Sequence, residues 1–213
     1  MDYEKTELYF LQKDVLRYFG DEEGQKIFRR AAKLYAELVV TTDYKNSQTL
    51  ERQLKRLIYP VLAFYKTLLT FGYKVPNALG IVRTETEKAA RESASVLANQ
   101  MRPLFPYRAF RRNIKNFMEY KFPSGGWESA GLRARGKKIS FQIRHCLYYA
   151  ITNKFGCPEL CGVFCDYERV AFAGLRPQIE CECEGTLANG HEFCDFHFNK
   201  GTRRERAKEK KKL

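Results

Sequence analysis

The segment from residue 157 to residue 198 constrains this chain more than any other part of its sequence. It holds six of the seven cysteines and two of the three histidines. Thiols and imidazoles are the side chains that bind soft metals and attack electrophilic carbon. A fold for this chain must therefore either gather several thiols in one place or bury them separately as small apolar groups.

The cellular compartment decides how these cysteines are interpreted. Residues 1–10 mix charges and lack the basic-then-apolar order of a secretory signal. No apolar run reaches the roughly 18 residues that a membrane-spanning helix needs. We therefore expect a cytoplasmic protein without a membrane partner. In that reducing compartment the thiols are expected to be free, metal-bound or catalytic rather than paired in disulfides.

The net charge of +13 is unevenly distributed along the chain. Residues 200–213 supply +6, through eight Lys or Arg and two Glu. We expect this tail to be disordered and solvated, because like charges repel one another and rarely pack. A second basic group, near the segment 132–138, comprises Arg108, Arg111, Arg112 and Lys115. Two interpretations stay open for it, a pocket for a carboxylate or phosphate and a solvated face. A nucleic-acid partner is not expected.

Apolar residues recur at helical spacing through residues 1–121, which we expect to be a helical region. Predicted helices cover residues 8–19, 21–39, 47–71, 84–101 and 107–120. Gly20 suits the end of the first helix, and Ser47 or Thr49 suits the start of the third. Pro60 predicts a kink or a break inside that third helix.

Residues 122–136 differ in composition, with four glycines, one proline and the only tryptophan of the chain. We expect a loop here. Trp127 then either stacks on a flat ligand or fastens the loop to the core.

Residues 137–199 alternate between strand and helix patterns. The alternation of Ile139, Phe141 and Ile143 with polar residues predicts a first strand. Two short helices and two further strands follow, and residues 137–199 are therefore expected to form a strand–helix–helix–strand–strand unit. The fold class predicted is α+β, with a helical amino-terminal part packed on a small antiparallel sheet in one compact domain.

Three thiols on separate predicted elements are candidates for a metal site. Cys165 lies on a helix, Cys183 (or Cys181) on a strand, and Cys194 on the last strand. A tetrahedral zinc ion needs three or four such ligands. No CxxC pair is present, so the spacing is not that of a zinc ribbon or finger. Zinc binding and burial as small hydrophobic groups are both left open.

Two of these cysteines are each followed by an aspartate, in Cys165–Asp166 and Cys194–Asp195. A carboxylate beside a thiol raises the pKa of that thiol by repulsion. The aspartates are therefore better suited to act as a base toward water or as an acid toward a ring nitrogen. His145, at the end of the first predicted strand, either pairs with a thiol or is a satisfied core residue.

The segments Pro158–Glu168 (PELCGVFCDYE) and Thr186–Phe198 (TLANGHEFCDFHF) resemble the L-2-amino-thiazoline-4-carboxylic acid hydrolase family. The shared elements are a Cys-Asp step after a PEL helix and a TLA-x-G-x-x-x-C-D-F ending. The resemblance implies hydrolysis of a small cyclic amidine to a carbamoyl product, such as the opening of an aminothiazoline carboxylate to N-carbamoyl-cysteine. In such a reaction an aspartate protonates the amidine, and water or Cys165 attacks its carbon.

The site expected from these arguments has catalytic and substrate-binding residues. The catalytic candidates are Cys165, Asp166, Asp195 and His145, and the substrate-binding candidates are Arg144, Trp127 and Arg112. The competing hypothesis is a zinc-stapled binding or sensor module, in which Cys165, Cys183 and Cys194 hold the metal. The ending is also similar to that of vinyl-reductase-type ligand-binding domains, some of which hold zinc in these cysteines. The role of Cys146 and the pairing of two chains into a homo-oligomer are left open.

Overall fold

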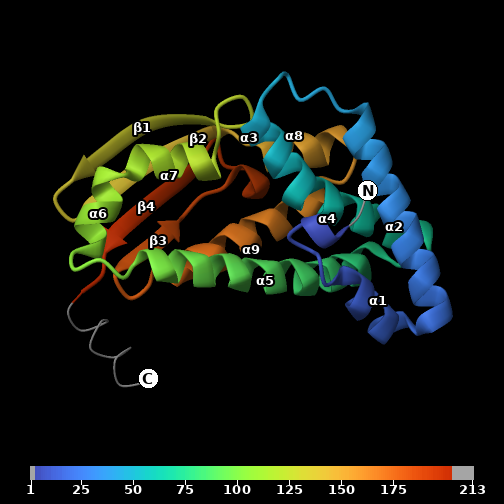
Figure 1. The fold of residues 1–213 in the computed structure, drawn as a ribbon. Helices are drawn as coiled ribbons and strands as arrows, with labels where there is room; N and C mark the ends of the chain where they lie inside the picture. Colours follow the sequence, from blue (N-terminus) through green and yellow to red (C-terminus); the bar gives the residue numbers. More distant parts are fainter. Residues whose placement is uncertain (1–2, 203–213) are drawn as a thin grey trace. The chain divides into compact units, whose positions relative to one another are not determined.

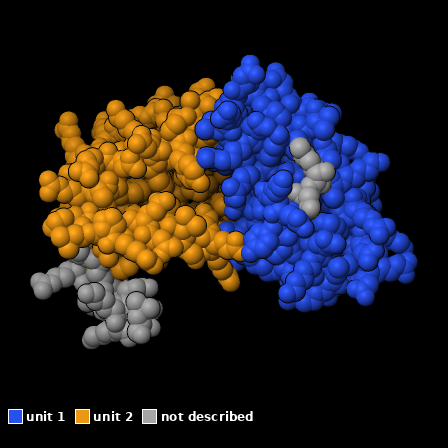
Figure 2. Space-filling view, in the orientation of Figure 1, with its two compact units in different colours: residues 1–89 blue, residues 90–213 orange. Residues whose placement is uncertain are grey.

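The structure, a computed structural model, describes residues 3–202 (Figure 1). Residues 203–213, most of the tail expected to be disordered, lie outside the described residues. The chain divides into two compact units, Met1–Ala89 and Ala90–Leu213 (Figure 2), and each is described separately. Within residues 3–202, no helix is long and apolar enough to cross a membrane.

The α+β class predicted from the sequence is confirmed. The helices are α1 (Leu11–Phe19), α2 (Asp21–Thr41), α3 (Gln48–Gln53), α4 (Tyr59–Thr70), α5 (Val75–Gln100), α6 (Pro106–Arg112), α7 (Ile114–Lys121), α8 (Leu147–Lys154) and α9 (Cys161–Phe172). The strands are β1 (Glu128–Arg135), β2 (Lys138–His145), β3 (Ile179–Cys183) and β4 (Cys194–Lys200). Short helical turns are η1 (Tyr3–Lys5), η2 (Leu54–Ile58), η3 (Pro158–Leu160), η4 (Ala173–Leu175) and η5 (Leu187–Asn189).

In unit 1, Pro60 explains an irregular turn between α3 and α4. Proline has no N–H, and its ring clashes with the carbonyl four residues earlier, which is that of Arg56. The turn η2, which contains Arg56, is a π-helix that leads directly into α4. The Arg56 carbonyl is satisfied elsewhere, because it accepts a hydrogen bond of 2.8 Å from the backbone N–H of Glu7. The predicted break is therefore a π-bulge in a continuous helical path.

Three other helix ends can be compared with those predicted from the sequence. Gly20 ends α1 with φ of +76°, and the hydroxyl of Ser47 caps α3 by accepting from the Leu50 N–H at 3.3 Å. Both helix ends are confirmed. Helix α5, however, begins at Val75 and not near Thr84. Pro76 lies in its first turn, where a missing N–H costs nothing, so this proline belongs to the start of a helix.

Unit 2 is built on a four-stranded antiparallel sheet in the order β1-β2-β4-β3. The expected strand–helix–helix–strand–strand unit is present as β2, α8, α9, β3 and β4. The loop expected over residues 122–136 is mostly wrong, because residues 128–135 form β1. Its register with β2 shifts between Ala130 and Arg133, around Gly131, which has φ of +67°. This bulge hides the strand's alternation in the sequence.

One face of the sheet carries the core of unit 2. Phe141 of β2 lies opposite Phe196 of β4, and their rings stack with centroids 5.4 Å apart. Phe117 of α7 and Phe172 of α9 both pack against Phe198 of β4. The residues of β3 and β4 that share this face, by register, include Cys181, Cys183 and Cys194. The sheet thus presents thiols and aromatic rings to the same helices.

Candidate functional site

Four thiols of unit 2 lie near one end of its sheet. Cys146 directly follows β2 and precedes α8, while Cys194 begins β4 opposite Ile143 of β2. Cys183 ends β3 opposite Phe196. Cys165 lies on α9. Within the described residues all seven cysteines are reduced.

The charges that these thiols would carry interact with one another. Burial, together with smaller contributions from the groups of Cys194 and Cys165, raises the pKa of Cys146 to about 12. Burial also raises the pKa of Cys183 to about 12, with contributions from the same two cysteines. For Cys194 the pKa is raised by burial and then by Cys165. Cys165 therefore interacts with each of the other three and is the centre of the group, which we call the thiol cluster (Cys146, Cys165, Cys183 and Cys194).

Cys165 has a further thiol neighbour one helical turn earlier. A hydrogen bond with the Cys161 thiol raises the pKa of Cys165 well above its usual range, and burial and the carboxylates of Asp166 and Glu168 act in the same direction. The thiols of the cluster are consequently protonated at neutral pH. A thiolate here requires a base or a cation that offsets these effects.

Backbone groups fix two of the thiols. The Cys183 Sγ donates to the carbonyl of Gly185 at 3.3 Å, and the Cys194 Sγ accepts from the Leu187 N–H at 3.4 Å. Both partners lie in the connection between β3 and β4, whose turn η5 is capped by the Thr186 hydroxyl. The hairpin segment of the TLA-x-G pattern thus orients the thiols on either side of it.

The aspartates predicted to be catalytic lie in two different places. Asp166 follows Cys165 on α9 and forms an ion pair of 2.9 Å with the exposed Arg169. Asp195 lies on the opposite face of the sheet from Cys194, because successive strand residues alternate. Its Oδ2 is 2.9 Å from Nε2 of His197, which shares that outer face. The structure therefore places Asp166 next to Cys165, whereas Asp195 pairs with His197 on the opposite face, from which its charge still raises the pKa of Cys183.

The remaining predicted site residues are separated as well. His145 and Arg144 are both exposed at the end of β2, where His145 lies opposite Glu128 of β1. Trp127 is only 3 % exposed, and its ring packs edge-on against Tyr148 of α8. Its indole N–H has no hydrogen-bond partner within residues 3–202. Trp127 is placed to fasten the segment before β1 to the core.

A buried ion pair lies next to the thiol cluster on α9. Nζ of Lys121, the last residue of α7, is 3.1 Å from Oε2 of Glu168, and their side chains are only 9 % and 7 % exposed. The Tyr148 hydroxyl donates to the other carboxylate oxygen at 2.9 Å. Burial and the charge of Glu168 raise the pKa of Tyr148 well above 10. Glu168 is three residues after Cys165, so both project from one side of α9.

Sequence reasoning missed this pair and the contribution of Cys146 to the cluster. The signal for Glu168 was its spacing from Cys165, since residues three apart share a helix face. The signal for Cys146 was its position directly after β2, beside the start of β4. Nothing in the sequence pattern identified Lys121 as the partner of Glu168, because the two residues meet only through tertiary packing.

The metal hypothesis stays a prediction. Thiols are the donors that zinc prefers, so the residue types of the cluster fit that ion. Among the residues that the structure describes, however, no group of three or more His, Cys, Asp or Glu is arranged to hold a metal. A zinc ion at Cys165, Cys183 and Cys194 would require these side chains to move closer together.

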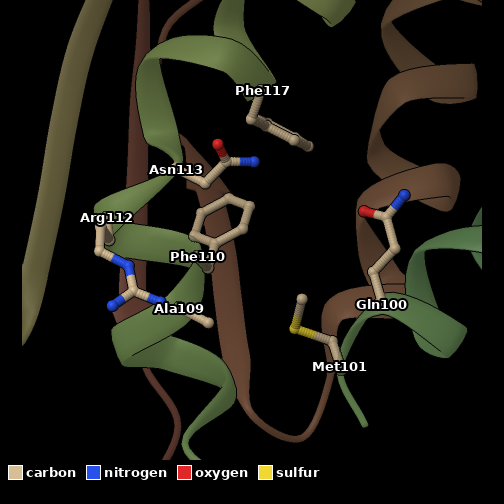
Figure 3. Close-up of a pocket in the computed structure, with 7 residues that line it drawn as sticks. All are labelled: Gln100, Met101, Ala109, Phe110, Arg112, Asn113 and Phe117. Atoms are coloured by element: carbon tan, nitrogen blue, oxygen red, sulfur yellow. The ribbon is translucent and has the colours of Figure 1, made fainter. Parts of the chain in front are cut away.

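A pocket of about 470 Å³ lies elsewhere in unit 2, between the end of α5 and helices α6 and α7 (Figure 3). Its apolar walls include Met101, Phe110 and Phe117. Figure 3 shows the amides of Gln100 and Asn113 on opposite sides of the cavity, whereas the guanidinium of Arg112 points away from it. Phe110 and Phe117 contact Phe198, near the end of β4 that is distant from Cys194.

Unit 2 is therefore an α+β unit with several reduced cysteines toward one end of its sheet. The chain belongs to the L-2-amino-thiazoline-4-carboxylic acid hydrolase family, whose model matches residues 51–198. The match includes the whole thiol cluster, Lys121 and Glu168. The resemblance found in the sequence is thereby confirmed.

No curated protein matches the chain. Among solved structures, the Fe(II) unliganded H-NOX protein from K. algicida is similar over 95 % of this chain and 98 % of that one, with 8 % sequence identity and a TM-score of 0.36. At that TM-score the similarity carries no argument about this chain.

Proposed function

We propose that this protein is a hydrolase that opens a small cyclic amidine, with L-2-amino-thiazoline-4-carboxylate as the first substrate to test, and that the reaction takes place at the thiol cluster. The family match supports the reaction class, and it covers all four cysteines of the cluster. The single observation that carries the location is the convergence of Cys146, Cys183 and Cys194 on Cys165.

The proposed reaction consumes one water molecule. Water adds its oxygen to the amidine carbon between sulfur and nitrogen, and the bond from this carbon to the ring sulfur breaks. The sulfur leaves with a proton as a thiol, and the former amidine carbon becomes the carbonyl of N-carbamoyl-cysteine. Protonation of the ring nitrogen makes that carbon more electrophilic.

Residues of this chain have distinct parts in the proposal. Cys165 is either the nucleophile itself or the residue that positions the substrate while a water molecule attacks it. Asp166 is the acid or base nearest to it on α9. Because the Cys165 thiol is protonated in the free protein, its proton must pass to a carboxylate or to the substrate before sulfur attacks. The buried Lys121–Glu168 pair holds α7 and α9 together beside this centre.

The proposed site does not include the catalytic roles that the sequence predicts for Asp195 and His145. Asp195 pairs with His197 on the outer face, and His145 is exposed at the end of β2. Arg144 lies on that outer face too, and Arg112 lines the pocket at the other end of the sheet. Variants of these four residues therefore serve as tests of an alternative site.

The second candidate function is a zinc-stapled ligand-binding or sensor module without catalysis. The observation that favours it is that the same four cysteines form a set of soft donors on separate elements, which is how structural zinc sites join a helix to a hairpin. In this case the thiols are expected to hold the fold together, and turnover is absent.

The experiment is to incubate the purified protein with L-2-amino-thiazoline-4-carboxylate, to follow the gain in mass of one water, and to quantify the new thiol with a thiol reagent after removal of the protein. Metal content is measured on the same preparation. Ring opening supports the hydrolase. Stoichiometric zinc with no ring opening, together with unfolding by a chelator, would support the binding module instead.

A further inference from the structure

The connection between α5 and α6 exposes two large apolar side chains side by side. Leu104 is 86 % exposed and Phe105 is 65 % exposed, and prolines precede and follow the pair at residues 103 and 106. Proline fixes φ and limits how far a loop can fold back on itself. Exposed Leu and Phe side chains are unfavourable in water. An adjacent pair of them on a short, stiff loop is typical of a surface that binds a protein or a membrane.

The segment that holds these two residues is strongly basic. Residues 101–118 contain no Asp or Glu and five cations, which are Arg102, Arg108, Arg111, Arg112 and Lys115. All five are exposed or partly exposed. Within residues 3–202, none of the five forms an ion pair with a carboxylate.

The turn between β1 and β2 brings further cations to the same end of unit 2. Arg111 donates to the carbonyl of Gly136 in this turn at 2.8 Å, which places α6 beside it. The turn and the strand ends next to it carry four exposed cations and no acid, and these are Arg133 and Arg135 of β1, Lys137 of the turn and Lys138 of β2. Figure 1 shows α6, the tip of β1 and the end of β4 together at one end of the unit. We call this surface, with Leu104 and Phe105, the basic end.

We propose that the basic end docks on an anionic lipid surface, with Leu104 and Phe105 entering the interface and the surrounding arginines and lysines contacting acidic headgroups. Each Lys or Arg near an anionic membrane strengthens binding, and the apolar pair supplies the term that does not depend on salt. This docking is reversible contact with a surface and involves no membrane-spanning helix.

The apolar pair is what favours lipid over nucleic acid as the occupant. A cationic surface that binds RNA needs phosphate contacts and aromatic rings on which bases stack. Phe105 offers one exposed ring of that kind, but Leu104, the most exposed of the large hydrophobic side chains within residues 3–202, cannot stack a base, and both side chains can enter the acyl boundary of a membrane. Arginine stems beside it can lie along the same boundary while their charged groups remain in water.

The basic end is far from the thiol cluster, so docking and catalysis are separable. Strand β4 runs from Cys194 to Lys200, which spans about 20 Å at the rise of an extended strand. Lys200 is fixed at the basic end, because its N–H donates to the Lys137 carbonyl at 2.8 Å. The proposal therefore does not depend on the proposed hydrolase activity.

The test is cosedimentation of the full chain with vesicles of phosphatidylcholine alone and of phosphatidylcholine with phosphatidylserine. We expect binding only to the vesicles with phosphatidylserine. Leu104→Ser/Phe105→Ser and, separately, Arg108→Glu/Arg112→Glu should each weaken it at least tenfold. The matched controls are Val96→Ser, an exposed apolar residue on α5, and Arg30→Glu/Lys33→Glu on α2, which changes the charge equally. All variants keep the basic tail, so differences cannot come from residues 203–213.

The possible results distinguish an anionic lipid surface from nucleic acid as the partner of the basic end. Loss of binding in both variants of the basic end, with both controls unchanged, supports lipid docking. Absence of binding by the unaltered chain to phosphatidylserine vesicles overturns the proposal, as does equal binding by Leu104→Ser/Phe105→Ser. Binding of a single-stranded RNA that is insensitive to the loss of Leu104 and Phe105, without vesicle binding, overturns it in favour of nucleic acid. Circular dichroism of every variant confirms that the fold is retained, which exposed positions should allow.

Discussion

The two ends of the sheet of unit 2 differ in what they expose and in what they bury. At one end, four thiols with raised pKa values lie beside a buried ion pair, and their neighbours on β2 and β4 are apolar. At the other end, exposed cations and two exposed apolar side chains face solvent. The same strand, β4, begins in the first environment and ends in the second.

Because of this difference, we expect substitutions at the two ends of the sheet to have different consequences. Buried ionisable groups are costly unless paired, so they persist where chemistry or specificity requires them. Exposed cations cost little, and their value depends on a partner of opposite charge. A substitution at the thiol end should therefore change activity or stability strongly, whereas one at the basic end should change the binding of a surface and leave folding nearly unaltered.

The largest effect is expected from Cys165→Ser. In a hydrolase it should lower turnover of the aminothiazoline carboxylate by at least about a thousandfold, because a weaker nucleophile or anchor replaces the thiol at the reacting centre. The melting temperature should change little. Cys157→Ala, a change of a buried cysteine of unit 2 outside the thiol cluster, is the control and should keep most of the activity. Unfolding of Cys165→Ser with loss of bound zinc would contradict the catalytic role.

The next largest effect concerns the buried pair. Lys121→Met leaves the Glu168 carboxylate buried without its cation, and we expect a loss of about 3–5 kcal/mol in the free energy of unfolding, measured with urea. In Lys121→Met/Glu168→Gln, the Gln side chain still accepts from the Tyr148 hydroxyl, and most of that loss should be recovered. Equal destabilisation of the single and the double variant would show that the charge pair is not the reason for the loss.

A third prediction uses pH. The Cys146 thiol has a folded pKa of about 12, above the value of about 8.5 for an unfolded cysteine. The folded state therefore keeps the proton that the unfolded state loses, and this stability is present below pH 8.5 and declines as pH rises toward 12. Each such thiol should lower the free energy of unfolding by up to about 1.4 kcal/mol per pH unit in that window.

Urea unfolding at pH 8 and pH 10 checks the alkaline prediction. Cys146→Ala should lose stability less steeply with pH than the unaltered chain, while the buried tyrosines contribute equally to both proteins. Identical slopes would show that Cys146 ionises normally in the folded state, and the argument for a neutral thiol cluster would be weakened at that residue.

The smallest effect is expected at the basic end. Arg111→Met removes an exposed hydrogen bond to the Gly136 carbonyl and should cost no more than about 1 kcal/mol. Arg108→Met, at an exposed position one helical turn earlier, should cost nothing measurable and serves as the control. A loss at Arg111 as large as that at Lys121 would break the contrast between the two ends.

How far the sequence predicts this structure depends on the range of the interactions. Alternation placed Cys181, Cys183 and Cys194 on the faces they occupy, and the Gly20 and Ser47 signals marked real helix ends, since these are local rules. Strand β1 was missed because the bulge at Gly131 breaks its alternation.

The site was harder to predict than the fold. The sequence predicts both Asp166 and Asp195 as catalytic residues, but adjacent residues of a strand point to opposite faces, and Asp195 pairs with His197 on the face opposite Cys194. The approach of Cys146 to the other thiols and the Lys121–Glu168 contact arise from the pairing of β2 with β4 and the packing of α7 near α9. No spacing rule along the chain contains that information.

The most direct test of the central claim is whether substrate occupies the thiol end. Iodoacetamide is applied in excess at pH 8.5 for several hours, long enough for thiols with raised pKa values to react. The labelling is done with and without L-2-amino-thiazoline-4-carboxylate that is renewed to saturation, and peptide mass spectrometry then follows each cysteine. We predict that substrate slows the labelling of Cys165 and Cys183 at least fivefold and leaves that of Cys181 unchanged. Equal labelling of Cys165 with and without substrate, under conditions in which ring opening proceeds, would place the reaction elsewhere and contradict the account.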